Sequence, residues 1–143
     1  MPVHMGVGIS SQADLAIAGR EAAELAIAQL SGRRPDLWLV FSSLRFAHPL
    51  LLKSIRSISM GTPLVGCTDA GGLVTSGPQR QSVIAVGLVG EGVRFLTAVD
   101  RNVSSHPRQS VEILSKELLT LHPVDPRVVL LFPDGLRANG SEV

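Results

Sequence analysis

The stretch Leu37-Trp-Leu-Val-Phe41 is an unbroken apolar run of the length of one β-strand. Side chains alternate between the two faces of a strand, so a strand that is apolar at every position is typical of a sheet covered on both faces. Layered α/β proteins cover their sheets in this way with helices. The run therefore predicts an α/β fold. Residues 128–132 have the same pattern and predict a second doubly covered strand.

Residues on both sides of this run predict the first helices and strands. Residues 3–9 predict an opening strand, and the segment Ser10-Ser-Gln-Ala-Asp14 can cap a helix that continues to about Leu30. Residues 49–58 predict a second helix, and Pro63 begins the next strand. The side chains of the second helix expected to face inward are Leu51, Leu52, Ile55 and Ile58.

The later part of the chain predicts a hairpin and a third helix. Residues 82–89 and 93–99 flank the short turn Gly90-Glu-Gly92, which is typical of an antiparallel hairpin. Residues 105–121 place Val111, Leu114, Leu118 and Leu121 on one helical face. We therefore expect a layered fold in which helices pack on a mixed sheet.

A shift of 91 positions aligns the two halves of the chain without a gap. Pro35 then falls on Pro126 and Phe41 falls on Phe132, which suggests half of a pseudo-symmetric domain. The second copy stops at Val143, where its helix should begin. We expect one domain over residues 1–143 that is incomplete at its C-terminal end. Such a chain should be a fragment of a longer protein or should self-associate through an open sheet edge.

Composition narrows the class of protein. A hydrophobic content of 45% in 143 residues suits one compact domain. Thirteen basic residues against 12 acidic ones leave a formal charge of +1 without a basic stripe, so we expect no nucleic-acid partner. The sequence has no apolar stretch near the roughly 20 residues that cross a membrane and no secretory pattern at its start. A single cysteine, Cys67, fits a reducing cytoplasm.

Polar residues follow the predicted strands at the positions where α/β proteins bind ligands. In Pro63-Leu-Val-Gly-Cys-Thr-Asp-Ala-Gly-Gly72, the run Leu64-Val65 predicts a buried strand that leads directly into a polar, glycine-rich turn. Thr68 and Asp69 could bind an amine or a hydroxyl, or could only satisfy the local backbone. The residues that we expect to bind a ligand are Ser42, Ser43, Cys67, Thr68, Asp69, Gly71, Gly72, Asp134 and Gly135.

Other chemistries have weaker support in the sequence. Cys67 could be a nucleophile, but a small, buried and inert thiol is the better prediction. The four histidines, at positions 4, 48, 106 and 122, have no spacing typical of a metal site, so we expect no metal and no cofactor, with haem as the alternative. Gly6 and Gly8 lie inside the first strand and do not form a dinucleotide motif.

These pieces together resemble the N-terminal part of the FIST domain, a family named for F-box and intracellular signal transduction proteins. The stretches that carry the resemblance are Gly6-Val-Gly8, Ala18-Gly-Arg-Glu-Ala-Ala23, Pro35-Asp-Leu-Trp-Leu-Val-Phe-Ser-Ser43, Pro63-Leu-Val-Gly-Cys-Thr-Asp-Ala-Gly71 and Leu131-Phe-Pro-Asp-Gly-Leu136. The family motif after the glycine-cysteine strand usually ends in an acidic residue, where this chain has Gly72. The family domain also continues well beyond the position of Val143.

The resemblance implies an intracellular sensory module that binds small ligands such as amino acids and acts with a signalling output domain or protein. One branch of the family is associated with haem-based sensing. We therefore expect a cytoplasmic, non-catalytic module that binds a small amino-acid-like ligand for signal transduction. The alternatives are an interaction subunit that oligomerises through an open sheet edge and, with less support, an enzyme that uses Cys67.

Overall fold

The computed structural model describes residues 1–46, 48–69, 71–75, 77–79, 81–101, 105–124 and 126–134. The chain forms two compact units, Met1–Phe95 and Leu96–Val143. Among the described residues, the first unit contains a mixed sheet with two α-helices and the second unit contains one α-helix. The predicted α/β fold is confirmed, and the prediction of one domain over the whole chain stays a prediction.

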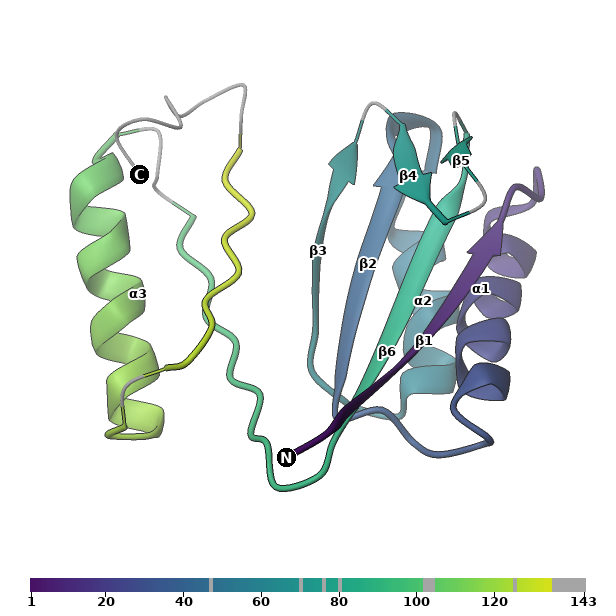
Figure 1. Cartoon of the computed structure of the whole chain (residues 1–143). Coiled ribbons are helices and arrows are strands. Elements are labelled where there is room, and N and C mark those ends of the chain that lie inside the picture. Colours follow the sequence, from purple (N-terminus) through teal and green to yellow (C-terminus); the bar gives the residue numbers. More distant parts are fainter. Residues whose placement is uncertain are drawn as a thin grey trace. The chain divides into compact units, whose positions relative to one another are not determined.

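The first unit is built on a four-stranded sheet with the order β1-β6-β2-β3. Its strands are β1 (Val3–Ser10), β2 (Leu37–Ser43), β3 (Leu64–Asp69) and β6 (Val83–Gly90). Strand β6 is antiparallel to both β1 and β2, whereas β2 and β3 are parallel. The carboxyl ends of β1, β2 and β3 therefore lie along one edge of the sheet (Figure 1).

Two helices cover one face of this sheet, α1 (Leu15–Gln29) and α2 (Pro49–Ser59), with a short 3-10 turn, η1 (Leu44–Phe46), before α2 (Figure 1). Asp14 caps α1 as predicted, because its carboxylate accepts the backbone N–H groups of Ala16 and Ile17. The core between helices and sheet consists of Ala18, Ala22, Ala23, Ala26, Trp38, Val40, Phe46, Leu51, Ile55, Val83 and Ala85. Alanines on α1 let this helix lie close to the sheet.

The approach of α1 to β1 is close enough to require glycine. A Cβ atom on Gly8 would collide with the backbone oxygen of Ala22, and one on Gly6 would collide with the backbone oxygen of Ala26. Gly6 and Gly8 therefore have a packing role in the first strand.

The other face of the sheet carries a second apolar cluster. Leu37, Leu39, Ile84 and Val86 are buried in it, and the partly buried residues around them include Val7, Phe41 and Val65. A small hairpin made of β4 (Gly72–Val74) and β5 (Gly77–Gln79) lies over this face, on the side away from α1 and α2 (Figure 1). Strand β2 is thus buried on both faces, as its apolar run predicts.

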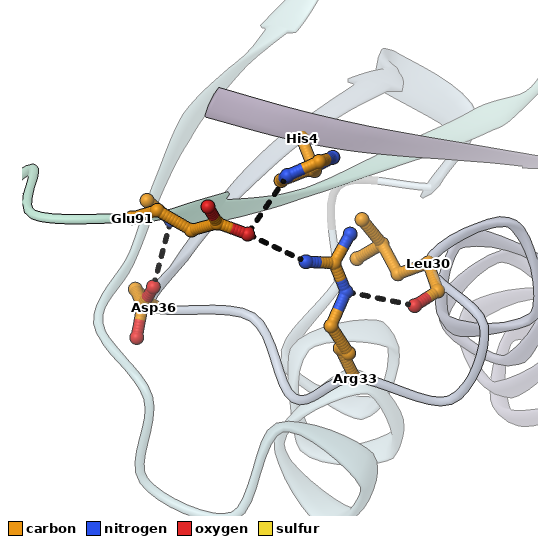
Figure 2. A network of polar contacts seen from close by, with 6 residues as sticks. His4, Leu30, Arg33, Asp36 and Glu91 are labelled. Atoms are coloured by element: carbon orange, nitrogen blue, oxygen red, sulfur yellow. Dashed lines mark hydrogen bonds and ion pairs between the residues drawn. The ribbon is translucent and has the colours of Figure 1, made fainter. Parts of the chain in front are cut away.

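A polar network ties together the end of the sheet away from the carboxyl ends of β2 and β3 (Figure 2). The carboxylate of Glu91, just after β6, accepts from His4 at 3.1 Å and from Arg33 at 3.4 Å. The backbone N–H of Gly90 donates to Asp36 at 2.9 Å. The network links the start of β1, the turn after α1 and the end of β6. Because its ion pairs are exposed to solvent, we expect it to contribute only modestly to stability.

The predicted hairpin of residues 82–89 and 93–99 is wrong. The first arm is a strand, β6, but residues 93–99 are not in a strand. Both edges of β6 are already paired, one with β1 and the other with β2, so no edge is left for a hairpin partner. The sheet is mixed as predicted, but its antiparallel pairs join strands far apart in sequence.

Two predictions about burial also need correction. The segment predicted as a buried strand is β3, the last strand of the described sheet, and its residues are half-buried or exposed. On α2, Leu52 is exposed, whereas Ser54 is buried beside Gly19 of α1. A Cβ atom on Gly19 would collide with the hydroxyl oxygen of Ser54, so the two helices meet through small residues that the apolar pattern of α2 did not indicate.

The second unit contains α3 (Pro107–Leu121), which agrees with the predicted helix to within two residues. Residues 128–132 are not in a strand, and their exposed fractions range from 37% for Phe132 to 77% for Val128. The prediction of a second doubly covered strand is therefore wrong. A strand needs a neighbouring strand, and residues 128–132 belong to neither of the two sheets formed by the described residues.

Candidate functional site

The parallel pairing of β2 and β3 brings four of the predicted site residues into two adjacent rows. Ser42 is the register partner of Thr68, and Ser43 is the partner of Asp69. Gly66 allows this pairing to be tight, because a Cβ atom there would collide with the backbone oxygen of Val40. The ends of β2 and β3 therefore lie side by side.

The two rows point to opposite faces of the sheet. Ser42 alternates with Trp38 and Val40, so Ser42 and Thr68 belong to the face covered by the helices. Ser43 alternates with Phe41, so Ser43 and Asp69 belong to the face under the hairpin, as does Cys67. The predicted residues thus divide between two places and do not form one cluster.

A groove of about 470 Å³ lies between the hairpin and this second face of the sheet. Its lining residues are Val7, Phe41, Asp69, Gly71, Gly72, Val74, Thr75, Ile84 and Val86. The volume lies within the range of about 300–1,000 Å³ that is typical of small-molecule sites. Apolar side chains from β1, β2 and β6 form the floor, so the groove combines an apolar body with one polar end.

Asp69 is the only ionisable side chain among the described residues that line the groove. Its Oδ1 atom is buried and accepts no hydrogen bond from any described residue. The hydroxyl oxygen of Ser43, its register partner, is also buried and without a partner in the described chain. Buried polar groups are nearly always hydrogen-bonded, so two neighbouring exceptions beside a groove mark a place suited to a polar ligand group.

Gly72 brings the hairpin close to the floor of the groove. A Cβ atom on Gly72 would meet Cδ1 of Ile84, so a larger residue there would have to displace that side chain. The FIST motif usually has an acidic residue at this position. Because this chain has Gly72 there, Asp69 is the one carboxylate among the described residues that line the groove.

Cys67 is exposed, which corrects the prediction of a buried thiol. Partial desolvation raises the pKa of the Cys67 thiol, and the negative charge of Asp69 raises this pKa further. A nucleophilic cysteine needs the opposite environment, one that favours the thiolate. The surroundings of Cys67 therefore disfavour the reactive thiolate, and the low reactivity of this thiol stays a prediction.

A second hollow lies at the opposite edge of the sheet, near Arg34 and Thr62. Its polar groups are engaged with one another: Arg34 donates to the carbonyl oxygen of Met60 at 2.6 Å, and Arg56 donates to that of Thr62 at 2.7 Å. These contacts fix the turn before β3. The polar groups of this hollow therefore have partners within the protein, whereas Oδ1 of Asp69 in the groove has none among the described residues.

The profile of the FIST N domain matches residues 36–143, which is most of the chain. The chain belongs to the FIST N domain family. FIST domains are sensory domains of signal-transduction proteins, and the family is not a known enzyme family. Among curated proteins, none matches the sequence. In this FIST N domain the match includes β2, β3, the hairpin and β6, whereas Val7 of the groove lies outside it.

Two further residues of this FIST N domain, Asp134 and Gly135, were also predicted to bind a ligand. Asp134 belongs to the second unit and does not follow a strand, because residues 128–132 do not form one. Gly135 lies outside the described residues.

Sequence reasoning missed the apolar floor of the groove. Val7, Phe41, Ile84 and Val86 were assigned only to strands, although they line the groove together with Asp69. Their alternation along each strand indicates that they share a face within that strand. It does not indicate which strands are neighbours.

Within the described ranges, no three His, Cys, Asp or Glu side chains lie together so that they could hold a metal ion. None of the helices in the described part of the chain is long and apolar enough to cross a bilayer.

Proposed function

We propose that this sensory domain binds a small, amino-acid-like ligand in the groove, with the amino group of the ligand at Asp69. The single observation that supports this proposal most strongly is the buried Oδ1 atom of Asp69, which lacks a hydrogen-bond partner among the described residues and lies at one end of an apolar groove. A protonated amine supplies a positive charge opposite the carboxylate of Asp69 and N–H groups that can donate to its Oδ1 atom.

The rest of the groove supports a ligand with an apolar body. Phe41, Ile84 and Val86 offer a continuous apolar floor, and Val74 adds an apolar side chain from the hairpin. Burial of the ligand on this floor contributes hydrophobic free energy, while Asp69 orients it. Family membership supports a role for such binding in signalling through an output domain or partner protein.

Titration calorimetry with a panel of amino acids and of the corresponding amines tests this proposal. We expect Asp69→Asn to weaken the binding of any ligand of the wild-type protein by about tenfold or more, because a charge-assisted hydrogen bond is lost. Glu24→Gln is the matched control, since it removes the same charge from an exposed position on α1. Absence of binding throughout the panel, or equal binding by Asp69→Asn, would overturn the proposal.

A second candidate function is self-association through the free edge of β3. This strand has a neighbour on one side only in the described sheet, and Thr68 near its end is exposed. Free strand edges pair readily with other chains, and a charged residue on such an edge opposes this. If β3 mediates association, Thr68→Lys should lower the weight-average mass in sedimentation at high protein concentration. A wild-type monomer at all concentrations would exclude this candidate.

A further inference from the structure

The charge of the groove narrows the class of ligand further. Its described lining contains one carboxylate and no basic side chain. Arg45, which follows β2, is engaged elsewhere: it donates to the side chain of Gln81 at 2.8 Å, and its guanidinium lies over the ring of Phe46 at 5.5 Å. A ligand in the groove therefore finds a partner for a positive charge and none for a negative charge among these residues.

We propose that the groove selects a monoamine with an apolar body over the amino acid that carries the same side chain. This inference rests on the proposed function, because it assumes that the amine lies at Asp69. The α-carboxylate of an amino acid is two bonds from the amino nitrogen, so an amino acid bound in this way places its own negative charge beside that of Asp69. Like charges brought together at a partly desolvated site strongly disfavour binding.

Ser43 does not remove this repulsion. Its hydroxyl group could donate to a ligand carboxylate, but Ser43 is the register partner of Asp69, so that carboxylate would still lie next to the aspartate. With an amine at Asp69, the Ser43 hydroxyl can still donate to the carboxylate of its register partner. Ser43 is 6% exposed and is not among the residues that line the groove, so Asp69 is the group of this pair that meets the ligand.

Three compounds with one phenyl group test the inference on the full chain: phenethylamine, phenylalanine and 3-phenylpropanoate. They carry an amine alone, an amine with a carboxylate, and a carboxylate alone. Dissociation constants are measured by titration calorimetry for the wild-type protein, Asp69→Asn and the control Glu24→Gln. Isoamylamine and leucine repeat the comparison with a smaller apolar body. Fluorescence of Trp38, which is fully buried, checks that each variant is folded.

We expect phenethylamine to bind the wild-type protein at least about tenfold more tightly than phenylalanine, and 3-phenylpropanoate not to bind. In Asp69→Asn the affinity for phenethylamine divided by the affinity for phenylalanine should fall toward one. In Glu24→Gln this ratio should stay at its wild-type value. Equal or tighter binding of phenylalanine that still depends on Asp69 would overturn this inference and leave the proposed function standing. Absence of binding by all five compounds would overturn both.

Discussion

Asp69 and Cys67 lie two positions apart on one face of β3, and the thiol therefore reports on the carboxylate. Desolvation and the charge of Asp69 both raise the pKa of the Cys67 thiol. A raised pKa lowers the thiolate fraction at neutral pH, and the thiolate is the species that reacts with alkylating reagents. The alkylation rate of the exposed Cys67 thiol can thus be used to detect the charge of the neighbouring Asp69 carboxylate.

We predict that Asp69→Asn accelerates the alkylation of Cys67 by iodoacetamide at neutral pH. The substitution removes the negative charge that opposes ionisation, so the pKa of the thiol falls and the rate-pH profile moves to lower pH. Rates are measured by mass spectrometry across a pH series, with Glu24→Gln as the control of equal charge. An unchanged profile in Asp69→Asn would show that the carboxylate does not act on the thiol.

Ser43 and Ser10 form a natural pair for a stability comparison. Both are buried serines at the ends of strands, but Ser10 donates to the carboxylate of Glu21, whereas the Ser43 oxygen has no partner among the described residues. Removal of an unpartnered buried hydroxyl is nearly neutral or stabilising, while removal of a partnered one costs about 1–3 kcal/mol.

We therefore predict that Ser43→Ala leaves the free energy of unfolding unchanged or slightly increases it, and that Ser10→Ala decreases it by about 1 kcal/mol or more. Urea denaturation followed by Trp38 fluorescence measures both values. A destabilised Ser43→Ala protein would mean that the hydroxyl has a partner in the folded chain, which would weaken the case for a ligand group there.

At the scale of elements, the contact of α1 with β1 depends on the absence of side chains. Gly8 lies against the backbone oxygen of Ala22. Any other residue at position 8 would have a Cβ atom that collides with this oxygen, so only glycine allows the helix to lie this close to the strand. Overpacking of a core by one methyl group costs about 1–3 kcal/mol when neighbours can move, and a backbone atom within a helix moves with difficulty.

We predict that Gly8→Ala lowers the free energy of unfolding by about 3 kcal/mol, toward the upper end for overpacking. Truncation of the opposing side chain in the double variant Gly8→Ala/Ala22→Gly should not rescue stability, because the colliding atom is a backbone oxygen. Thermal and urea denaturation measure both variants. Rescue by Ala22→Gly would show that a side chain, not the backbone, limits the approach.

Local patterns predicted the elements with different success. The apolar run of β2, the capped α1 and the helix α3 were predicted correctly, because strand and helix periods appear within a few consecutive residues. The arm of residues 93–99 was not, because its pairing depended on whether β6 had a free edge. That edge is occupied by β1, which is some 80 positions away in sequence.

At the scale of the whole molecule, the two compact units differ in their share of the core. The buried hydrophobic side chains of the described chain all lie between Ala18 and Val86, within the unit Met1–Phe95. In the unit Leu96–Val143, the described residues 128–132 expose apolar side chains. The first unit thus contains the sheet, its two covering helices and the groove.

We predict that a fragment of residues 1–95 folds on its own, since both apolar clusters lie within it. Its circular dichroism should show the helices α1 and α2, and Trp38 fluorescence should report cooperative unfolding in urea. The same ligand affinities as in the full chain would place the proposed groove wholly in this unit. A fragment without cooperative unfolding would show that the core needs residues beyond Phe95.

The sequence by itself determined which segments form β1, α1, β2, α2 and α3, and that polar residues follow the strands. These features depend on contacts between near neighbours along the chain, so composition and period reveal them. Only the tertiary structure decided that Ser42 and Thr68 face the helices while Ser43 and Asp69 face the groove, and that β1, β2 and β6 together supply its apolar floor. Strand order and the face each residue occupies depend on pairing between distant segments, which a local pattern does not specify.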